Sequence, residues 1–157
     1  MTRQLTIYFA GSISGGRGDL EQYKKIVAAL EADGHRVLAG AVAAEHVTDG
    51  GEPLDACAIF DRDLGWIAHA DVLVAEVSMP STGVGYEIAT ARYRYQIPVI
   101  CLYRPAFTKR CTAMVAGDAE IALIEYDDAG TMLARLRAEL AKYSAGPSGY
   151  SRRRTPA

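Results

Sequence analysis

Short apolar runs alternate with longer amphipathic stretches along the chain. The first run, 6–10, is β-branched and aromatic and stops at a glycine, which predicts a buried strand. The run 72–77 is almost uninterrupted in its apolar character, as is typical of a central parallel strand covered on both faces. Three further strands are expected at 36–38, 99–103 and 121–126.

Between these runs, apolar residues recur with the spacing of a helix. The stretch that starts at Asp19 places apolar residues on one face and charges between them, and Gly34 marks its end. Residues 79–85 carry small residues and a proline, which predicts a turn before the next helix. Further helices are expected at 55–69, about 86–95, within 109–115 and over 132–143.

Strand and helix alternate about five times, and this alternation predicts an α/β fold. We expect a single domain with a five-stranded parallel, doubly wound sheet of the flavodoxin or Rossmann type, over residues 1–143. From residue 144 to 157 the composition shifts to Gly, Pro, Ser and three consecutive arginines, which predicts a flexible basic tail. Ligands of such sheets bind at the carboxyl ends of the strands. Three segments follow predicted strands and are expected at this edge: 11–18, 79–85 and 104–111.

The composition narrows the function classes. The chain has 157 residues, half of them hydrophobic, and a formal net charge of −2, which disfavours disorder and a broad nucleic-acid footprint. No apolar run approaches the roughly 18 residues needed to cross a bilayer. The apolar stretch near the N-terminus is too short for the core of a signal peptide. Cys57, Cys101 and Cys111 form no CxxC pair and the histidines show no ligand spacing, so we expect a cytoplasmic protein without a metal site.

The segment between the first strand and the first helix has the features of an anion-binding loop. Its four glycines allow close backbone approach, and the free N–H groups at a helix start favour a negative charge. It matches neither a P-loop nor G-x-G-x-x-G, so a flexible turn that only needs small residues is the alternative. The candidate anion-binding residues are Gly11, Ser12, Ile13, Ser14, Gly15, Gly16 and Arg17.

Two acidic residues and a tyrosine are candidates for chemistry. Glu87 follows Ser81 in the second loop and is expected in the first turn of a helix, where it could also serve only the helix dipole. Asp63 lies one turn before apolar residues of its helix, so it faces either the apolar side or solvent. The two carboxylates would suit acid–base or glycosidic chemistry, although spacing alone does not show that they meet. The Tyr8 hydroxyl is either satisfied in the core or reaches the site.

Taken in order, these motifs resemble the 2′-deoxynucleoside 5′-monophosphate N-glycosidases of the nucleoside 2-deoxyribosyltransferase superfamily. The resemblance runs from about Tyr8 to Tyr126, most of the chain, and its sharpest part is Gly-Val-Gly-Tyr-Glu at 83–87, with a serine six residues before the glutamate. The matching segments are 8–13, 15–17, 63–66, 70–72, 75–77, 80–81 and 83–87.

The resemblance implies hydrolysis of the bond between base and deoxyribose in a deoxynucleotide. The products would be a free base and 2-deoxyribose 5-phosphate, formed through a covalent glycosyl intermediate without a metal or an organic cofactor. Glu87 would be the nucleophile, Asp63 the acid that protonates the departing base, and Tyr8 the residue that positions Glu87.

The resemblance also implies a phosphate pocket shared between two subunits. A hydroxyl from the neighbouring subunit closes the pocket in this family, and Thr112 stands at the matching position, which implies a homodimer. Ser14 stands where the family commonly has an arginine. The remaining phosphate contacts would come from Ser12, the backbone near Gly15 and Gly16, Ser81 and Gly83.

Two alternatives remain open at this point. A nucleoside 2-deoxyribosyltransferase would share the carboxylates and the covalent intermediate, but a second base would accept the sugar in place of water. A non-catalytic nucleotide-binding module would use the same loops without turnover. The serine-rich phosphate cradle favours the hydrolase, whose partner is a small deoxynucleotide and not a nucleic-acid polymer or a membrane.

Overall fold

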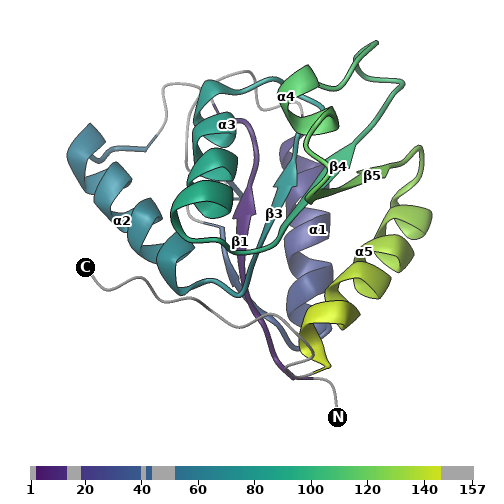
Figure 1. The fold of residues 1–157 in the computed structure, drawn as a ribbon, viewed down its shortest axis with the longest axis horizontal. Helices are drawn as coiled ribbons and strands as arrows, with labels where there is room; N and C mark the ends of the chain where they lie inside the picture. Colours follow the sequence, from purple (N-terminus) through teal and green to yellow (C-terminus); the bar gives the residue numbers. More distant parts are fainter. Residues whose placement is uncertain (1–2, 14–18, 40–41, 44–51, 146–157) are drawn as a thin grey trace.

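The computed structural model describes residues 3–13, 19–39, 42–43 and 52–145, shown in colour in Figure 1. Its centre is a five-stranded parallel sheet with the strand order β2-β1-β3-β4-β5. This order confirms the predicted flavodoxin-like, doubly wound architecture. The strands are β1 (Thr6–Ala10), β2 (Arg36–Leu38), β3 (Val72–Glu76), β4 (Val99–Tyr103) and β5 (Ile121–Glu125).

Helices cover both faces of the sheet, as Figure 1 shows. Helices α1 (Leu20–Ala32) and α5 (Ala129–Ser144) bury their apolar stripes against one face. The other face is covered by α2 (Ala56–His69), α3 (Thr82–Ala89), the π-helix η1 (Thr90–Arg94) and the short α4 (Ala113–Ala116). Strands β3 and β4 are buried along their whole length, as their continuous apolar runs predict for strands between two helical layers.

The start of α3 corrects one prediction. The helix begins at Thr82, four residues before the expected start, so residues 82–85 are helical and not part of a turn. Ser81 is extended and its hydroxyl accepts a hydrogen bond from the Val84 N–H at 3.3 Å, which caps the helix. Glu87 therefore lies in the second turn of α3 and not in the first, beyond the reach of a simple interaction with the helix start.

Two other boundaries differ slightly from the prediction. The short helix expected within 109–115 begins only at Ala113. Helix α5 ends at Ser144, and residues 146–157 of the expected tail lie outside the described residues. None of the helices in the described part of the chain has the length and apolar character needed to cross a membrane.

Candidate active site

A cavity of about 440 Å³ opens at the carboxyl edge of the sheet, between the end of β1, helix α2 and the start of α3. Parallel α/β sheets bind ligands at this edge, at the point where the strand order reverses, which here lies between β1 and β3. The wall includes seven of the predicted site residues, Tyr8, Gly11, Ile13, Asp63, Ser81, Gly83 and Glu87. The fold thus brings together residues that are separated by up to 79 positions in the chain.

Glu87 and Tyr8 form a direct contact inside this cavity. Tyr8 is 4% exposed and packs with the α2 and α3 side of the core, and its hydroxyl donates to Glu87 Oε1 at 2.9 Å. Burial raises the pKa of Glu87 to about 7, with the nearby Asp63 charge acting in the same direction and the Tyr8 hydrogen bond opposing it. The pKa of Tyr8 is raised by its own burial and by Glu87, so the phenol stays a hydrogen-bond donor.

Asp63 lines the same cavity from α2, whereas its neighbour Asp61 is exposed on the outer side of the helix. Burial raises the pKa of Asp63, and the hydrogen bond and charge of Arg62 oppose that effect. The pKa of each of the two carboxyls in the cavity is therefore higher than that of an exposed acid. Raised pKa values of this kind are typical of carboxyls that donate and accept protons in a reaction.

Helix α2 and the segment before it supply two wall residues that the sequence analysis did not identify. The Arg62 guanidinium donates to both oxygens of Glu52, at 2.5 and 2.7 Å, and from Nε to Asp63 Oδ1 at 2.9 Å. Both Arg62 and Glu52 line the cavity. The charged triplet Asp61-Arg62-Asp63 was visible in the sequence, but the ten-residue separation of Arg62 from Glu52 follows no helical spacing.

The described part of the predicted anion loop is tightly packed. A Cβ at Gly11 would lie 3.0 Å from both the Tyr23 ring and Val42 Cγ1, so a larger residue there would force these two side chains to move. Ser12 is 2% exposed. The other predicted members of the loop, Ser14, Gly15, Gly16 and Arg17, lie outside the described residues.

Thr112 lies apart from this cavity. It precedes the first residue of α4, it is exposed, and it is not part of the cavity wall in its own chain. Within one protomer the structure therefore does not bring Thr112 together with Tyr8, Asp63 and Glu87.

A buried polar cluster behind the predicted anion loop was also missed by the sequence analysis. Glu76, 0% exposed at the end of β3, accepts hydrogen bonds from the Ser78 N–H at 3.1 Å, the Ser78 hydroxyl and the Tyr126 hydroxyl at 3.1 Å. Arg104 lies 3.7 Å from Glu76 and pairs with Asp19, which is buried at the start of α1. The one signal in the sequence was an acidic residue within the otherwise apolar run 72–77.

The chain belongs to the nucleoside 2-deoxyribosyltransferase family, because the model of that family matches residues 7–113. It is 43% identical over 143 residues to a protein of Syntrophotalea carbinolica that is provisionally named 2′-deoxynucleoside 5′-phosphate N-hydrolase 1, covering 91% of this chain and 99% of the relative. It is 42% identical over 125 residues to the 5-hydroxymethyl-dUMP N-hydrolase of Danio rerio, covering 79% and 86%.

A solved structure supports the fold independently. The CMP N-glycosidase BcmB of Clostridium botulinum superposes with a TM-score of 0.62 over 85% of this chain and 98% of its own, at 16% sequence identity. The likeness therefore concerns the arrangement of strands and helices.

Proposed function

We propose that this protein hydrolyses the N-glycosidic bond of 2′-deoxynucleoside 5′-monophosphates and releases the free base and 2-deoxyribose 5-phosphate. The observation that carries the proposal is the placement of Glu87 and Asp63 in one cavity, with Tyr8 bonded to Glu87. Cleavage of a glycosidic bond requires two carboxyl groups in different surroundings, so that one is ionised while the other is protonated. Relatives that are more than 40% identical to this chain over the aligned residues are named as hydrolases of deoxynucleotides.

The proposed first step is attack by Glu87. Its ionised carboxylate forms a bond to C1′ while the bond from C1′ to the base nitrogen breaks, and Asp63 donates a proton to the departing base. The transition state resembles an oxocarbenium ion, so the adjacent carboxylate stabilises its positive charge. Tyr8 holds Glu87 Oε1 and leaves the other oxygen of the same carboxylate for the sugar.

In the second step a water molecule attacks C1′ and releases Glu87. Asp63, now ionised, accepts the proton of that water, so both side chains return to their starting state. The sugar lacks a 2′-hydroxyl, whose electron withdrawal would oppose charge development at C1′. Deoxyribose therefore reacts more readily than ribose with the same two carboxyls.

The 5′-phosphate is assigned to the small residues at the end of β1 and at the start of α3. Ser81, Thr82 and Gly83 line the cavity at the start of α3, and the start of a helix favours a negative charge. Gly83 has only the Ser81 hydroxyl within 4 Å of a notional Cβ, which leaves room for a ligand to approach the backbone. The proposed cradle also includes Gly11, Ser12 and Ile13, together with Ser14, Gly15, Gly16 and Arg17.

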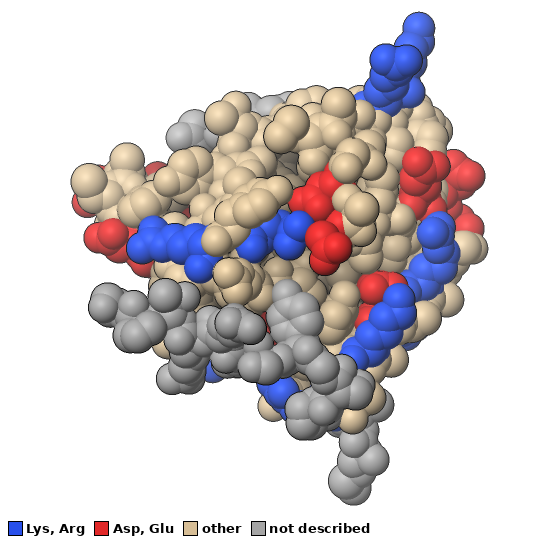
Figure 2. All heavy atoms as spheres, viewed as in Figure 1, with Lys and Arg blue, Asp and Glu red and all other residues tan. Residues whose placement is uncertain are grey.

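We also propose a homodimer in which Thr112 of one subunit closes the phosphate pocket of the other. Figure 2 shows that the face formed by α2, α3 and α4 is largely uncharged, apart from a band of basic side chains that meets acidic ones. Large apolar side chains are exposed on α3, η1 and α4, where Tyr86 is 60%, Tyr93 74% and Met114 85% accessible. Large exposed apolar groups favour burial against a second subunit.

A reducing cytoplasm is the compartment that we propose. Its support is the state of the three cysteines, which are all free thiols, with Cys57 exposed and Cys101 buried.

The test is a substrate panel analysed by chromatography. Incubation with deoxynucleotides, ribonucleotides and deoxynucleosides should release base from the deoxynucleotides alone, and Glu87→Ala and Asp63→Asn should abolish the release. Addition of a free acceptor base separates hydrolysis from transfer, because a transferase would form an exchanged nucleotide. Equal activity on deoxynucleosides without phosphate would overturn the phosphate assignment, and the absence of any turnover would favour a binding module.

A further inference from the structure

Arg62 occupies a part of the cavity that the two proposed chemical steps leave without a role. Its side chain is 24% exposed, and its two partners in the ion cluster are less exposed still, Glu52 at 12% and Asp63 at 20%. A cation held beside the proposed acid affects the reaction directly, because it favours the form of Asp63 that has already lost its proton.

The guanidinium is fixed on three sides. Both oxygens of Glu52 accept its terminal N–H groups, which is the bidentate geometry that holds arginine most firmly. The Trp66 ring, one helical turn further along α2, lies 4.7 Å below it in a cation–π contact. The remaining Nε donates to Asp63 Oδ1 at 2.9 Å. The Asp63 carboxyl is thus held through a group that is itself immobilised.

We propose that Arg62 is a positioning residue for the proposed acid: anchored by Glu52 and Trp66, it holds the Asp63 carboxyl toward the cavity and controls how readily that carboxyl takes up a proton. This inference rests on the proposed function, in which Asp63 protonates the base. It extends that function to two residues, Arg62 and Glu52, that make no bond to the reacting atoms.

The charges around Asp63 act in opposite directions. In the described part of the cavity, Asp63 faces Arg62 on its own helix, Glu52 from the preceding segment, Glu87 from α3 and Tyr8 from β1. Burial raises the pKa of Asp63, the hydrogen bond and charge of Arg62 oppose this rise, and the Glu52 charge adds to it. An acid that must donate a proton and then recover one works best when neither form is strongly favoured. Glu52 neutralises Arg62 in part and so prevents the arginine from fixing Asp63 in its ionised form.

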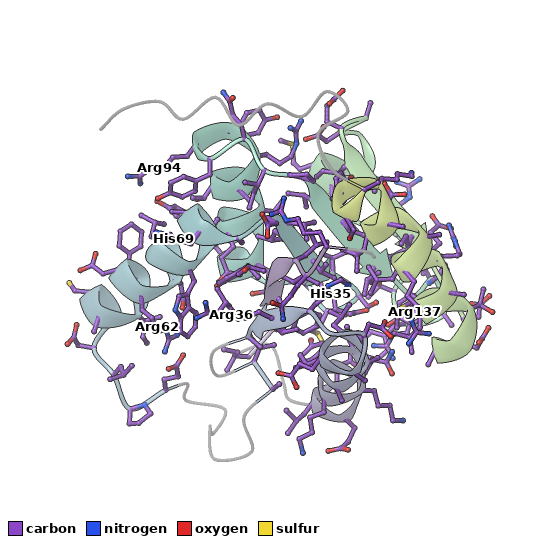
Figure 3. All side chains as sticks on the ribbon, turned by 90° about the horizontal axis from the view of Figure 1, so that it is seen from below. His35, Arg36, Arg62, His69, Arg94 and Arg137 are labelled. Atoms are coloured by element: carbon purple, nitrogen blue, oxygen red, sulfur yellow. The ribbon has the colours of Figure 1, made fainter. Side chains whose placement is uncertain are left out.

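Opposite shifts in two variants therefore test the idea. In Arg62→Gln the carboxyl of Asp63 should titrate at higher pH, and in Glu52→Gln at lower pH, each by about half a pH unit or more. Arg62→Lys keeps the charge and should remain closer to the parent protein. Arg137→Gln is the matched control, since Arg137 forms a similar two-bond pair with Asp33 and lies on α5, on the opposite side of the molecule from Arg62 in Figure 3.

The direct measurement is the carboxyl ¹³C titration of labelled aspartate, with the Asp63 signal identified from its loss in Asp63→Asn. The pH profile of kcat/KM for base release should move in the same direction as that titration in each variant. A merely structural role would alter the stability of the variants without moving the Asp63 titration in opposite directions.

Two results would overturn the proposal: an unmoved Asp63 titration in folded Arg62→Gln, or shifts of the same sign in Arg62→Gln and Glu52→Gln. If Arg62→Gln does not fold, the comparison of Glu52→Gln with Arg62→Lys decides the question, and the absence of a downward shift in Glu52→Gln overturns it. If the parent protein releases no base from any deoxynucleotide, the proposed function fails while the ¹³C titration still decides whether Arg62 controls Asp63.

Discussion

The buried carboxyl of Glu87 should make the protein less stable above neutral pH, and Glu87→Gln should remove this cost. The pKa of Glu87 is about 7 in the folded protein, against an ordinary value of 4.5, mainly because burial disfavours the charge. Between these two values the folded chain binds a proton that the unfolded chain has released. The free energy of unfolding therefore falls as the pH rises from about 4.5 to about 7, and the loss is complete above pH 7.

The size of the effect follows from the difference between the two pKa values. Each unit corresponds to about 1.4 kcal/mol, and the carboxyl keeps some contact with the open cavity, so we expect a cost of about 2 to 3 kcal/mol for ionised Glu87. Glutamine has nearly the same shape, can accept the Tyr8 hydrogen bond and cannot ionise. In a domain of this size the gain corresponds to about 5 to 10 °C in Tm.

The assay is urea unfolding at about pH 4 and about pH 8, at one protein concentration. Relative to the parent protein, Glu87→Gln should gain more stability at pH 8 than at pH 4, where Glu87 is mostly protonated in both the folded and the unfolded state. Subtraction of the two differences removes the intrinsic difference between an amide and a carboxylic acid. Glu21→Gln is the control, because that side chain is 76% exposed. The reasoning is refuted if Glu87→Gln changes stability equally at both pH values.

Three other predictions concern neighbouring groups. Tyr8→Phe removes the donor to Glu87, so the pKa of Glu87 should rise above 7 and kcat/KM between about pH 6 and 7 should fall about tenfold, visible in a pH profile. Arg104→Met leaves the buried Glu76 and Asp19 without their cation and should lower the free energy of unfolding by about 3 to 5 kcal/mol in urea titrations. Thr112→Ala should raise KM for deoxynucleotides, whereas full activity of a diluted monomer would contradict the shared pocket.

The strands were the most predictable part of the fold. Each predicted strand matches an observed strand to within one residue, and β3 and β4 were the clearest because burial between two helical layers leaves little room for polar positions. The start of α3 was predicted wrongly, because two glycines close together favour a turn in isolation. In the folded chain the Ser81 cap and the packing of Val84 and Ile88 against the sheet outweigh that preference.

The sequence predicted which residues could take part in a reaction, but not the contacts between them. Residue type alone marked Asp63 and Glu87 as candidates, while the resemblance to a family indicated their roles. The bond from Tyr8 to Glu87 joins a strand to a helix across 79 positions, and no local pattern encodes such a contact. The ion pair of Arg62 with Glu52 was missed for the same reason, since the segment that carries Glu52 has no helical register with α2.

Two polar clusters meet the carboxyl edge of the sheet from opposite faces, and their burial indicates different tasks. Glu87 and Asp63 line an open cavity on the α2 and α3 side, where a carboxyl can change its protonation during a reaction. Glu76 is fully buried on the α1 and α5 side and is satisfied by Ser78, Tyr126 and Arg104, so a change in its charge would disrupt several bonds at once. Arg104 links this second cluster to Asp19, which directly follows the predicted anion loop. Gly11, the first residue of that loop, lines the cavity. The buried cluster therefore holds Asp19 at the start of α1, whereas the two carboxyls of the cavity lie in the site proposed for the reaction.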